Sequence, residues 1–166
     1  MTLTLTLTAS IAGRAQSDGD LTSVAADINN IRKISYRTGS GANQANQFFS
    51  DRRTLAASTS EDLDLSGALT DAFGASIAFT KVKAIQVTAP TTNTNDVVIG
   101  GAAANAFVGP FGASTHKVSV PPGGVVTLAN PTAAGWTVTA ATGDLLKIAN
   151  SAAGSSVDYE IVIVGA

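Results

Sequence analysis

The stretch GDLLKIANSAAGSSVDYEIVIVG, residues 143–165, decides the fold class of this chain. Residues 145–150 and 157–164 are mainly apolar, β-branched or aromatic, and the six residues between them are small or polar. This pattern predicts two strands joined by a turn, and therefore a β-hairpin. Because a hairpin is marginally stable by itself, we expect it to join a larger sheet.

One face of these two strands should be buried against earlier strands. The expected members of this buried set are Leu145, Ile148, Tyr159, Ile161 and Ile163, together with Ile77, Phe79, Ile85, Val87, Val118 and Val120. Val162 and Val164 alternate with the set and are also apolar, so the second face of the last strand needs a cover too. Either the first third of the chain or another subunit would provide it.

Short apolar runs recur before this stretch, from residue 76 onward, at spacings of about 8 to 12 residues. We predict strands at residues 77–79, 82–87, 97–99, 117–120, 125–128 and 136–139. Residues 121–124, with the sequence PPGG, are the strongest turn signal in the chain. This rhythm indicates an all-β fold, a jelly-roll-like antiparallel β-sandwich, with at most one short helix.

The chain begins with a different pattern. Residues 2–8 alternate threonine and leucine without error, which predicts a strand with Leu3, Leu5 and Leu7 on its buried face. Such a strand must be paired, because a bare one is a template for aggregation. It either docks on its own sheet or adds to a neighbouring subunit as an intermolecular arm.

Two segments between the arm and the strands have helical features. Apolar side chains recur at helical spacing over residues 20–31, which predicts a short helix with Asp20 as its cap. Residues 67–74 are expected to form a helical turn. Since the composition changes near residue 60, we predict an extended N-terminal arm and irregular assembly region over 1–60 and a β-sandwich domain over 61–166.

The charged residues and the lack of cysteine limit the classes of function that this chain can have. Charged residues make up 13% of the chain, against a usual share of about 25%. This is common in β proteins and also suits proteins packed into large assemblies, where desolvating charge is costly. The net charge of −2 predicts no nucleic-acid or membrane partner. There is no cysteine, which excludes disulfides, thiolate catalysis and cysteine-based metal sites.

No set of residues in the sequence specifies a reaction. His116 is the only histidine, and without a carboxylate nearby in sequence it is expected to be a surface loop residue. The acidic segment 61–64 alternates with leucine, which favours a solvated strand face over a calcium site. Residues 93–96 favour a turn stabilised by Asn and Asp side chains. We therefore predict a non-enzymatic protein with no catalytic residue, metal or cofactor.

The most suggestive polar group combines aromatic residues and arginines, which are typical interface anchors. Arg52 and Arg53 follow Phe48 and Phe49, and the two arginines either contact another subunit or pair within the chain with the carboxylates of residues 61–62. The candidate partner contacts are therefore Leu3, Leu5, Leu7, Phe48, Phe49, Arg52 and Arg53.

Several motifs resemble small virion proteins of tailed bacteriophages. They are FFSDRRTLA at 48–56, EDLDL at 61–65, LTDAFG at 69–74, KAI at 83–85, NTNDVVIGG at 93–101, Pro121 with Gly123 and Gly124, and GDLL at 143–146 with its continuation to 165. The similarity covers residues 33–165. It implies a non-enzymatic virion structural protein with a jelly-roll-like domain.

The resemblance does not choose between head and tail, and a third role from another class of protein is also open. The first is a capsid decoration or cement protein on the capsid exterior, a homotrimer whose arm reaches neighbours and the major capsid protein. The second is a tail, neck or fibre component that contacts another virion protein. The third is a carbohydrate-binding module for host attachment, for which Trp136, expected in the core or at its rim, would be the stacking residue.

Overall fold

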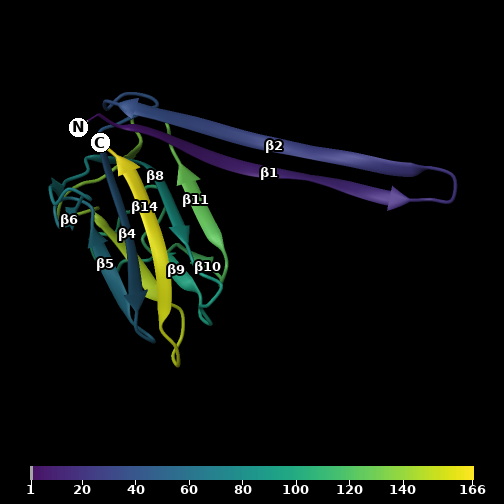
Figure 1. Cartoon of the computed structure of the whole chain (residues 1–166). Coiled ribbons are helices and arrows are strands. Elements are labelled where there is room, and N and C mark those ends of the chain that lie inside the picture. The colour runs from purple at the N-terminus through teal and green to yellow at the C-terminus, as the bar shows by residue number, and fades with distance from the viewer. Residues whose placement is uncertain (1) are drawn as a thin grey trace.

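A computed structural model describes residues 2–166, and Met1 lies outside this range. Within the described residues every regular element is a β-strand. The chain has two parts, a long two-stranded hairpin that projects to one side and a β-sandwich (Figure 1). The all-β prediction is confirmed.

The projecting hairpin, called the arm below, consists of β1 (Thr4–Asp18) and β2 (Ser23–Thr38). The two strands pair antiparallel without interruption from Thr4 opposite Arg37 to Asp18 opposite Ser23. At about 3.4 Å per residue, a strand of this length extends roughly 50 Å. At the base of the arm, β3 (Gln44–Ala45) pairs parallel with the end of β2.

The helix predicted over residues 20–31 is wrong, because this segment is the turn and first half of β2. The predictive signal was ambiguous: Val24 and Ile28 are four residues apart, which places them on one face of a helix and equally on one face of a strand. Pairing with β1 decides between the two. The helical turn predicted over 67–74 is also wrong: this range contains the short strand β6 (Leu69–Thr70) between non-helical turns, and β6 pairs with β7 (Ser76–Ile77) just beyond it.

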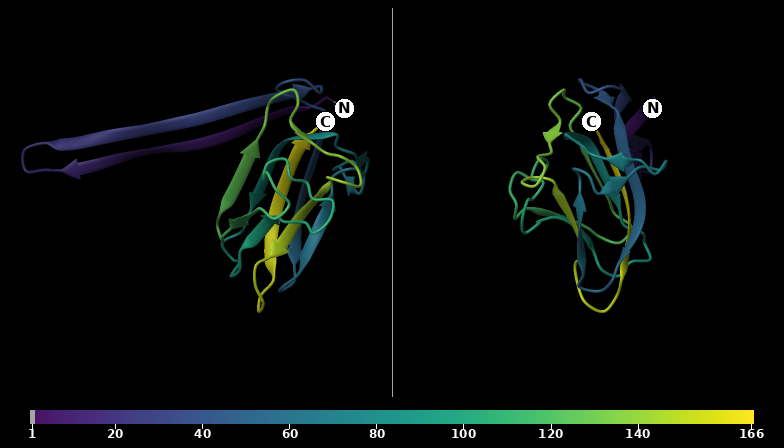
Figure 2. Two further views of the ribbon diagram at one scale, coloured as in Figure 1. Left: turned by 180° about the vertical axis from the view of Figure 1, so that it is seen from behind. Right: turned by 90° about the vertical axis from the view of Figure 1, so that its left-hand side faces the viewer.

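The sandwich consists of two facing sheets (Figure 2). The five-stranded sheet has the order β11-β8-β14-β4, with β12 beside β8, and the four-stranded sheet has the order β10-β9-β13-β5. The strands of the larger sheet are β4 (Gln47–Leu55), β8 (Lys81–Thr88), β11 (Val125–Ala129), β12 (Trp136–Thr137) and β14 (Val157–Gly165). Those of the smaller sheet are β5 (Ser60–Asp64), β9 (Val97–Gly100), β10 (Lys117–Val120) and β13 (Leu145–Asn150). The strands predicted from residue 76 onward are all present.

The closing stretch is not a hairpin. Its strands β13 and β14 form at the predicted positions, but β13 pairs with β5 and β9, whereas β14 pairs with β4 and β8. The turn between them therefore carries the chain from one sheet to the other. Asn150 holds this corner, because its side-chain amide donates to the carbonyls of Ala56, at 3.1 Å, and Ser155, at 2.8 Å.

Other connections also cross between the sheets, namely β4 to β5, β5 to β8 (by way of β6 and β7), β8 to β9, β10 to β11 and β12 to β13. As a result the main strands pair in a nested order along the chain. The first of them pairs with the last (β4 with β14), the second with the seventh (β5 with β13), the third with the sixth (β8 with β11) and the fourth with the fifth (β9 with β10).

The core lies between the two sheets and follows the alternation of the strands. The predicted buried set lies there, except that Leu145 and Val118 are only half-buried. On β13 the alternation runs through Leu146 and Ile148, so Leu146 occupies the inward position predicted for its neighbour. The pairing of β13 with β5, which sets Leu146 opposite Leu63, fixes this register.

The division predicted between residues 60 and 61 does not coincide with the change from arm to sandwich. The arm ends at Thr38, and β4 runs beside β14 over its whole length inside the larger sheet.

Candidate assembly surface

The base of the arm rests on the outer face of the larger sheet, the face turned away from the smaller sheet. Leu3 is buried here, and Leu5 and Leu7 are half-buried while the threonines between them are exposed. These leucines form a second apolar cluster with Ile34, Tyr36, Ala45, Ala84, Val164 and Phe48. The alternation predicted for residues 2–8 is confirmed. This docked part, residues 3–8 and 33–38, is called the arm root below.

Hydrogen bonds tie the arm root together and to the sheet. The backbone amide of Leu3 donates to the hydroxyl of Thr38 at 2.7 Å, and the Tyr36 hydroxyl donates to the carbonyl of Lys83 at 3.2 Å. Val164 is covered by this packing, so for this residue the first third of the chain is the cover and not another subunit, whereas Val162 remains 36% exposed. The cover of the outer face is therefore incomplete.

Lys83 is fully buried behind the arm root. Its ammonium donates to the carbonyls of Gly41 at 3.3 Å and Ala133 at 3.0 Å, and also to that of Thr132. These carbonyls belong to two loops, one at the base of the arm and one before β12. Burial, and then the nearby charge of Lys81, lower the pKa of Lys83. Sequence reasoning missed this residue, because a lysine within a strand ordinarily indicates an exposed position.

Beyond the root, every residue from 9 to 32 is exposed. Cross-strand partners lie on the same face of a ribbon, so the register assigns each side chain of this free arm, residues 9–32, to one of two faces. The face continuous with Leu5 and Leu7 is mainly apolar: it carries Ala9, Ile11, Gly13, Ala15, Val24, Ala26 and Ile28, and also the polar residues Ser17, Asn30 and Arg32. Ile11 is 73% exposed, Val24 69% and Ile28 56%. Because most of its residues are apolar, it is called the apolar face of the arm below.

The opposite face of the free arm is mostly polar. Arg14 and Asp27 are cross-strand partners there and form an ion pair at 3.7 Å. Asp18 accepts hydrogen bonds from the side chains of Gln16 and Ser23, both at 2.9 Å, and these bonds lower the pKa of Asp18. The free arm is therefore amphipathic, with water on both of its faces in the isolated chain.

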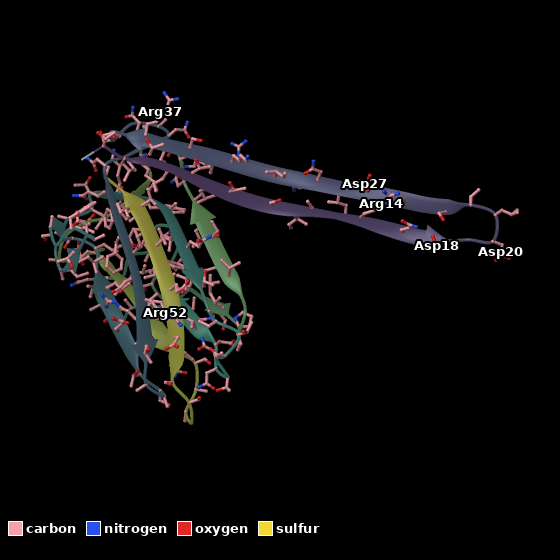
Figure 3. The ribbon with its side chains drawn as sticks, viewed as in Figure 1. Arg14, Asp18, Asp20, Asp27, Arg37 and Arg52 are labelled. Carbon is pink, nitrogen blue, oxygen red and sulfur yellow. The ribbon has the colours of Figure 1, made fainter. Side chains whose placement is uncertain are left out.

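Charge is unevenly distributed along the arm. Asp18 and Asp20 lie at the tip, and Arg37 lies at the root (Figure 3). Arg32 and Lys33 are also near the root, since they pair with Ala9 and Thr8. The tip is therefore acidic and the root basic.

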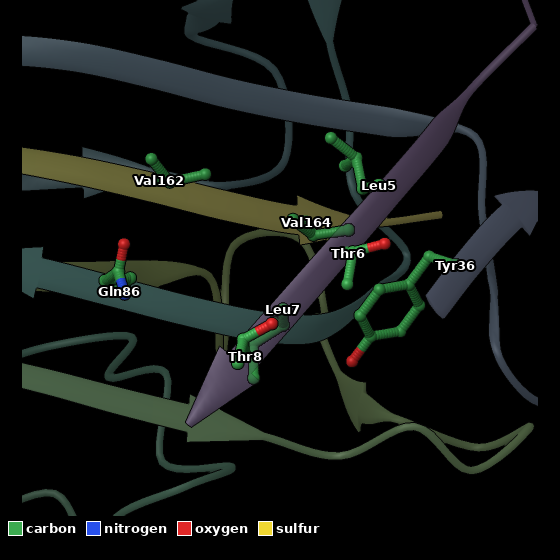
Figure 4. A pocket seen from close by; sticks show the side chains of 9 residues that line it. Leu5, Thr6, Leu7, Thr8, Tyr36, Gln86, Val162 and Val164 are labelled. Atoms are coloured by element: carbon green, nitrogen blue, oxygen red, sulfur yellow. The ribbon is translucent and has the colours of Figure 1, made fainter. Parts of the chain in front are cut away.

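A pocket of about 150 Å³ lies between β1 and the outer face (Figure 4). Its walls are mainly apolar. They are formed by Leu5, Thr6, Leu7, Thr8, Tyr36, Ala84, Gln86, Val162 and Val164. Val162 is therefore exposed to a cavity between the arm root and the outer face, and this cavity is large enough for one aliphatic side chain.

The remaining candidate contacts lie on β4. Phe48 packs against the arm root, whereas Phe49 is buried in the core between the sheets. Arg52 is largely exposed on the outer face, where its guanidinium lies 3.9 Å from the carboxylate of Asp158. Whether any of these residues contacts a partner stays a prediction, and Phe49 has little surface to offer.

Arg53 pairs with carboxylates of its own chain, which is one of the two arrangements that the sequence suggested. Its guanidinium pairs with Glu61 on the facing sheet and, at 2.8 Å, with Asp51 on its own strand, and it lies 5.6 Å from the ring centre of Phe49. Tyr159 donates a hydrogen bond to the same Glu61 carboxylate at 2.7 Å. Burial, and then this bond, raise the pKa of the Tyr159 hydroxyl. The group closes one side of the sandwich.

The residues that the sequence suggested for catalysis, sugar stacking or calcium binding lie in a loop, at the rim of the core and in a hydrogen-bonded connection. His116 is an exposed loop residue, as predicted, and its Nδ1 lies 2.7 Å from the carbonyl of Phe111. Trp136 is half-buried at the rim of the core. Asn93 exchanges two hydrogen bonds with the backbone of Asp158, so its side chain ties the loop of residues 93–96 to β14. Over residues 2–166 no cluster of metal-binding side chains is found, nor any helix able to cross a membrane.

Comparison with known proteins adds little to this description. No family model matches the chain, and no curated protein does. A solved structure from work titled "Bacillus endospore appendages form a novel family of disulfide-linked pili" aligns with a TM-score of 0.37 and 15% identity, over 71% of this chain and 87% of that one. A likeness of this degree carries no inference about function.

Proposed function

We propose that this chain is a non-enzymatic structural protein of a phage virion, most simply a capsid decoration or cement protein on the capsid exterior. It would act as a homotrimer that contacts the major capsid protein. The observation that carries the assembly role is the free arm, whose apolar face is exposed along its whole length. The virion setting rests on the resemblance of residues 33–165.

The physical need for a partner supports the assembly role. A two-stranded ribbon is marginal in water, because it cannot bury enough surface to offset the entropy of ordering its residues. Ile11, Val24 and Ile28 gain nothing from folding while they remain in water. Two open strand edges over this length also invite pairing with another chain. A surface of this kind is suited to an interface.

We also propose that the sandwich is a jelly roll. The nested pairing supports it, since a long hairpin of four strand pairs that wraps around a core produces this strand order in two sheets. Jelly rolls are frequent in viral capsid proteins and also occur in lectins and cupins. The proposed fold therefore agrees with a virion role by analogy, but it does not distinguish that role from the functions of other jelly-roll proteins.

On a capsid lattice, weak arm contacts would act together. Once one contact anchors a copy, its other contacts form at a high effective concentration, so that the combined affinity exceeds that of any single arm. Because the surface has few charges, little desolvation cost opposes close packing. The expected effect on the particle is resistance to heat and to low ionic strength.

A shortened arm tests the proposal. Thr8 and Lys33 are cross-strand partners, so an Asn-Gly turn can replace residues 9–32 and leave the root and sandwich in place. We expect this variant to fold with an unchanged melting temperature and to be lost from purified particles, as measured by quantitative mass spectrometry. Full occupancy and unchanged particle stability would contradict the role of the arm.

The alternative within the same class is a tail, neck or fibre component. Mass spectrometry of separated heads and tails distinguishes the two. Recovery with the tails alone would end the decoration proposal and leave the arm as a connector within the tail.

A further inference from the structure

The apolar face of the free arm has no cover within its own chain. We infer that it packs against the same face of the arm of a second copy, with the two arms antiparallel about a two-fold axis. The biological setting of this contact rests on the proposed function, which the contact deepens by naming the surface through which copies join.

The part of the apolar face that lies in the root already packs against apolar side chains of the same chain. At the root, the same face docks on apolar side chains through Leu5 and Leu7. In the free arm its β-branched residues alternate with small ones: Gly13 lies opposite Ile28, with no atom within 4 Å of the position its Cβ would take. Two such faces can approach closely, because the larger side chains of one meet gaps in the other. A two-layer stack of ribbons also converts an isolated hairpin into a packed sandwich.

Charge selects the antiparallel orientation. The tip carries Asp18 and Asp20, Lys33 lies in the root and Arg32 lies next to it; of these, Arg32 belongs to the apolar face, whereas Asp18 and Lys33 belong to the opposite face. Antiparallel arms bring each acidic tip beside the basic root of the partner, whereas parallel arms bring two acidic tips together. The arrangement is self-complementary, as an interface about a two-fold axis requires.

The equal length of the two arms determines where each tip lies on the partner. The two free arms are identical, so full antiparallel overlap sets the tip of one against the root of the other. Leu21 at the tip is 96% exposed, and the apolar pocket beside Val162 lies at the root. The cavity of about 150 Å³ has room for a leucine side chain. Leu21 of each copy therefore occupies the pocket of its partner.

A two-fold contact and a homotrimer are compatible. The arm contact then joins copies from different trimers, as neighbouring positions on a closed lattice require.

Sedimentation velocity on the isolated protein tests the contact. We expect a concentration-dependent dimer that Ile28→Ser weakens about tenfold or more, because the substitution acts in both copies. Ile31→Ser is the matched control: it lies on the same strand, is 50% exposed and belongs to the opposite face, and it should leave the association constant unchanged. Equal effects of the two variants, or a monomer at all concentrations, would overturn the inference.

Single cysteines test the orientation, since the chain has none of its own. Mixing Leu21→Cys with Val162→Cys under mild oxidation should give a mixed disulfide-linked dimer. Efficient Leu21→Cys homodimers without the mixed product would indicate parallel arms and refute the antiparallel contact. Leu21→Cys linked mainly to an Asn29→Cys chain would place the tip on the polar face and refute it as well.

Charge exchange gives an independent readout. Replacing Asp18 and Asp20 by lysine should weaken the dimer, and replacing Arg32 and Lys33 by glutamate in the same chain should restore it. Parallel arms predict little change for both variants, because each tip would then meet an identical tip and like charges would only replace like charges of the opposite sign. These assays need no virion. If arms fail to associate while the shortened arm still abolishes particle binding, the proposed function survives and this inference fails.

Discussion

Replacing Lys83 by methionine should destabilise the protein by about 3 kcal/mol. The substitution keeps the unbranched apolar part of the buried side chain and removes the ammonium, which leaves the carbonyls of Gly41, Thr132 and Ala133 without their donor. Hydrogen bonds to a charged group contribute about 1.5–3 kcal/mol each. Two effects reduce the sum: methionine needs no desolvation of a charge, and water can reach part of the exposed loop that contains Thr132 and Ala133.

Urea unfolding followed by circular dichroism measures this loss, with Lys147→Met as the control. Lys147 also lies in a strand, β13, but is only half-buried, so we expect a change below about 0.5 kcal/mol. Hydrogen exchange adds a local readout. Because Lys83 joins the loop at the base of the arm to the loop before β12, faster exchange should be confined to residues 36–45 and 130–135.

A stability of Lys83→Met within about 0.5 kcal/mol of the parent, with unchanged exchange in both loops, would refute the reasoning. It would mean that the three carbonyls are satisfied by water once the lysine is gone. The arm root would then be held by its apolar cluster alone.

Further expectations concern the core, the tyrosines and the corner between the sheets. Ile161→Asp should unfold the sandwich, whereas Val162→Asp, one residue further on the outer face, should remain folded; a soluble, cooperatively melting Ile161→Asp variant would place that strand outside the core. Both tyrosines, Tyr36 and Tyr159, have pKa values raised above 10.0 by burial, so the folded state keeps protons that the unfolded chain releases. Stability should therefore be complete below pH 10 and fall above it, by up to about 1.4 kcal/mol per pH unit for each tyrosine. Urea titrations at pH 9 and 11 check this, and Tyr36→Phe should remove part of the slope. Asn150→Ala should cost about 2 kcal/mol and lower the melting temperature by roughly 6 °C in calorimetry; an unchanged melting temperature would show that the corner needs no side-chain amide.

The positions of the strands were predictable because local patterns determine them. Period-two alternation and the turn residues at 121–124 located almost every strand of the sandwich within one or two residues. Pairing was not predictable. The small polar residues 151–156 are compatible with a tight hairpin and with a corner between sheets. The choice depends on whether both edges of β13 and β14 are already occupied, which is a property of the whole sheet.

The assembly surface was predictable in part for a related reason. The alternation of residues 2–8 revealed the leucine face of the root, because that face is buried and its pattern is strict. The free arm has a weaker pattern, with alanine and glycine at several apolar positions and with Val24 and Ile28 at helical spacing. Lys83 gave no signal, since its three acceptors come from loops more than 40 residues away in sequence.

The two faces of the free arm also explain how association can stop at a defined size. An amphipathic ribbon with open edges would stack without limit if both of its faces were apolar. Here only one face is apolar, and the other carries the Arg14–Asp27 ion pair. Once two arms cover their apolar faces, the stack presents charged and polar side chains outward on both sides, so that a third arm would have to desolvate them. Replacing Arg14 and Asp27 together by valine should therefore convert a closed dimer into higher oligomers in sedimentation velocity. A variant that remains a dimer would show that the strand edges, and not the polar face, limit the assembly.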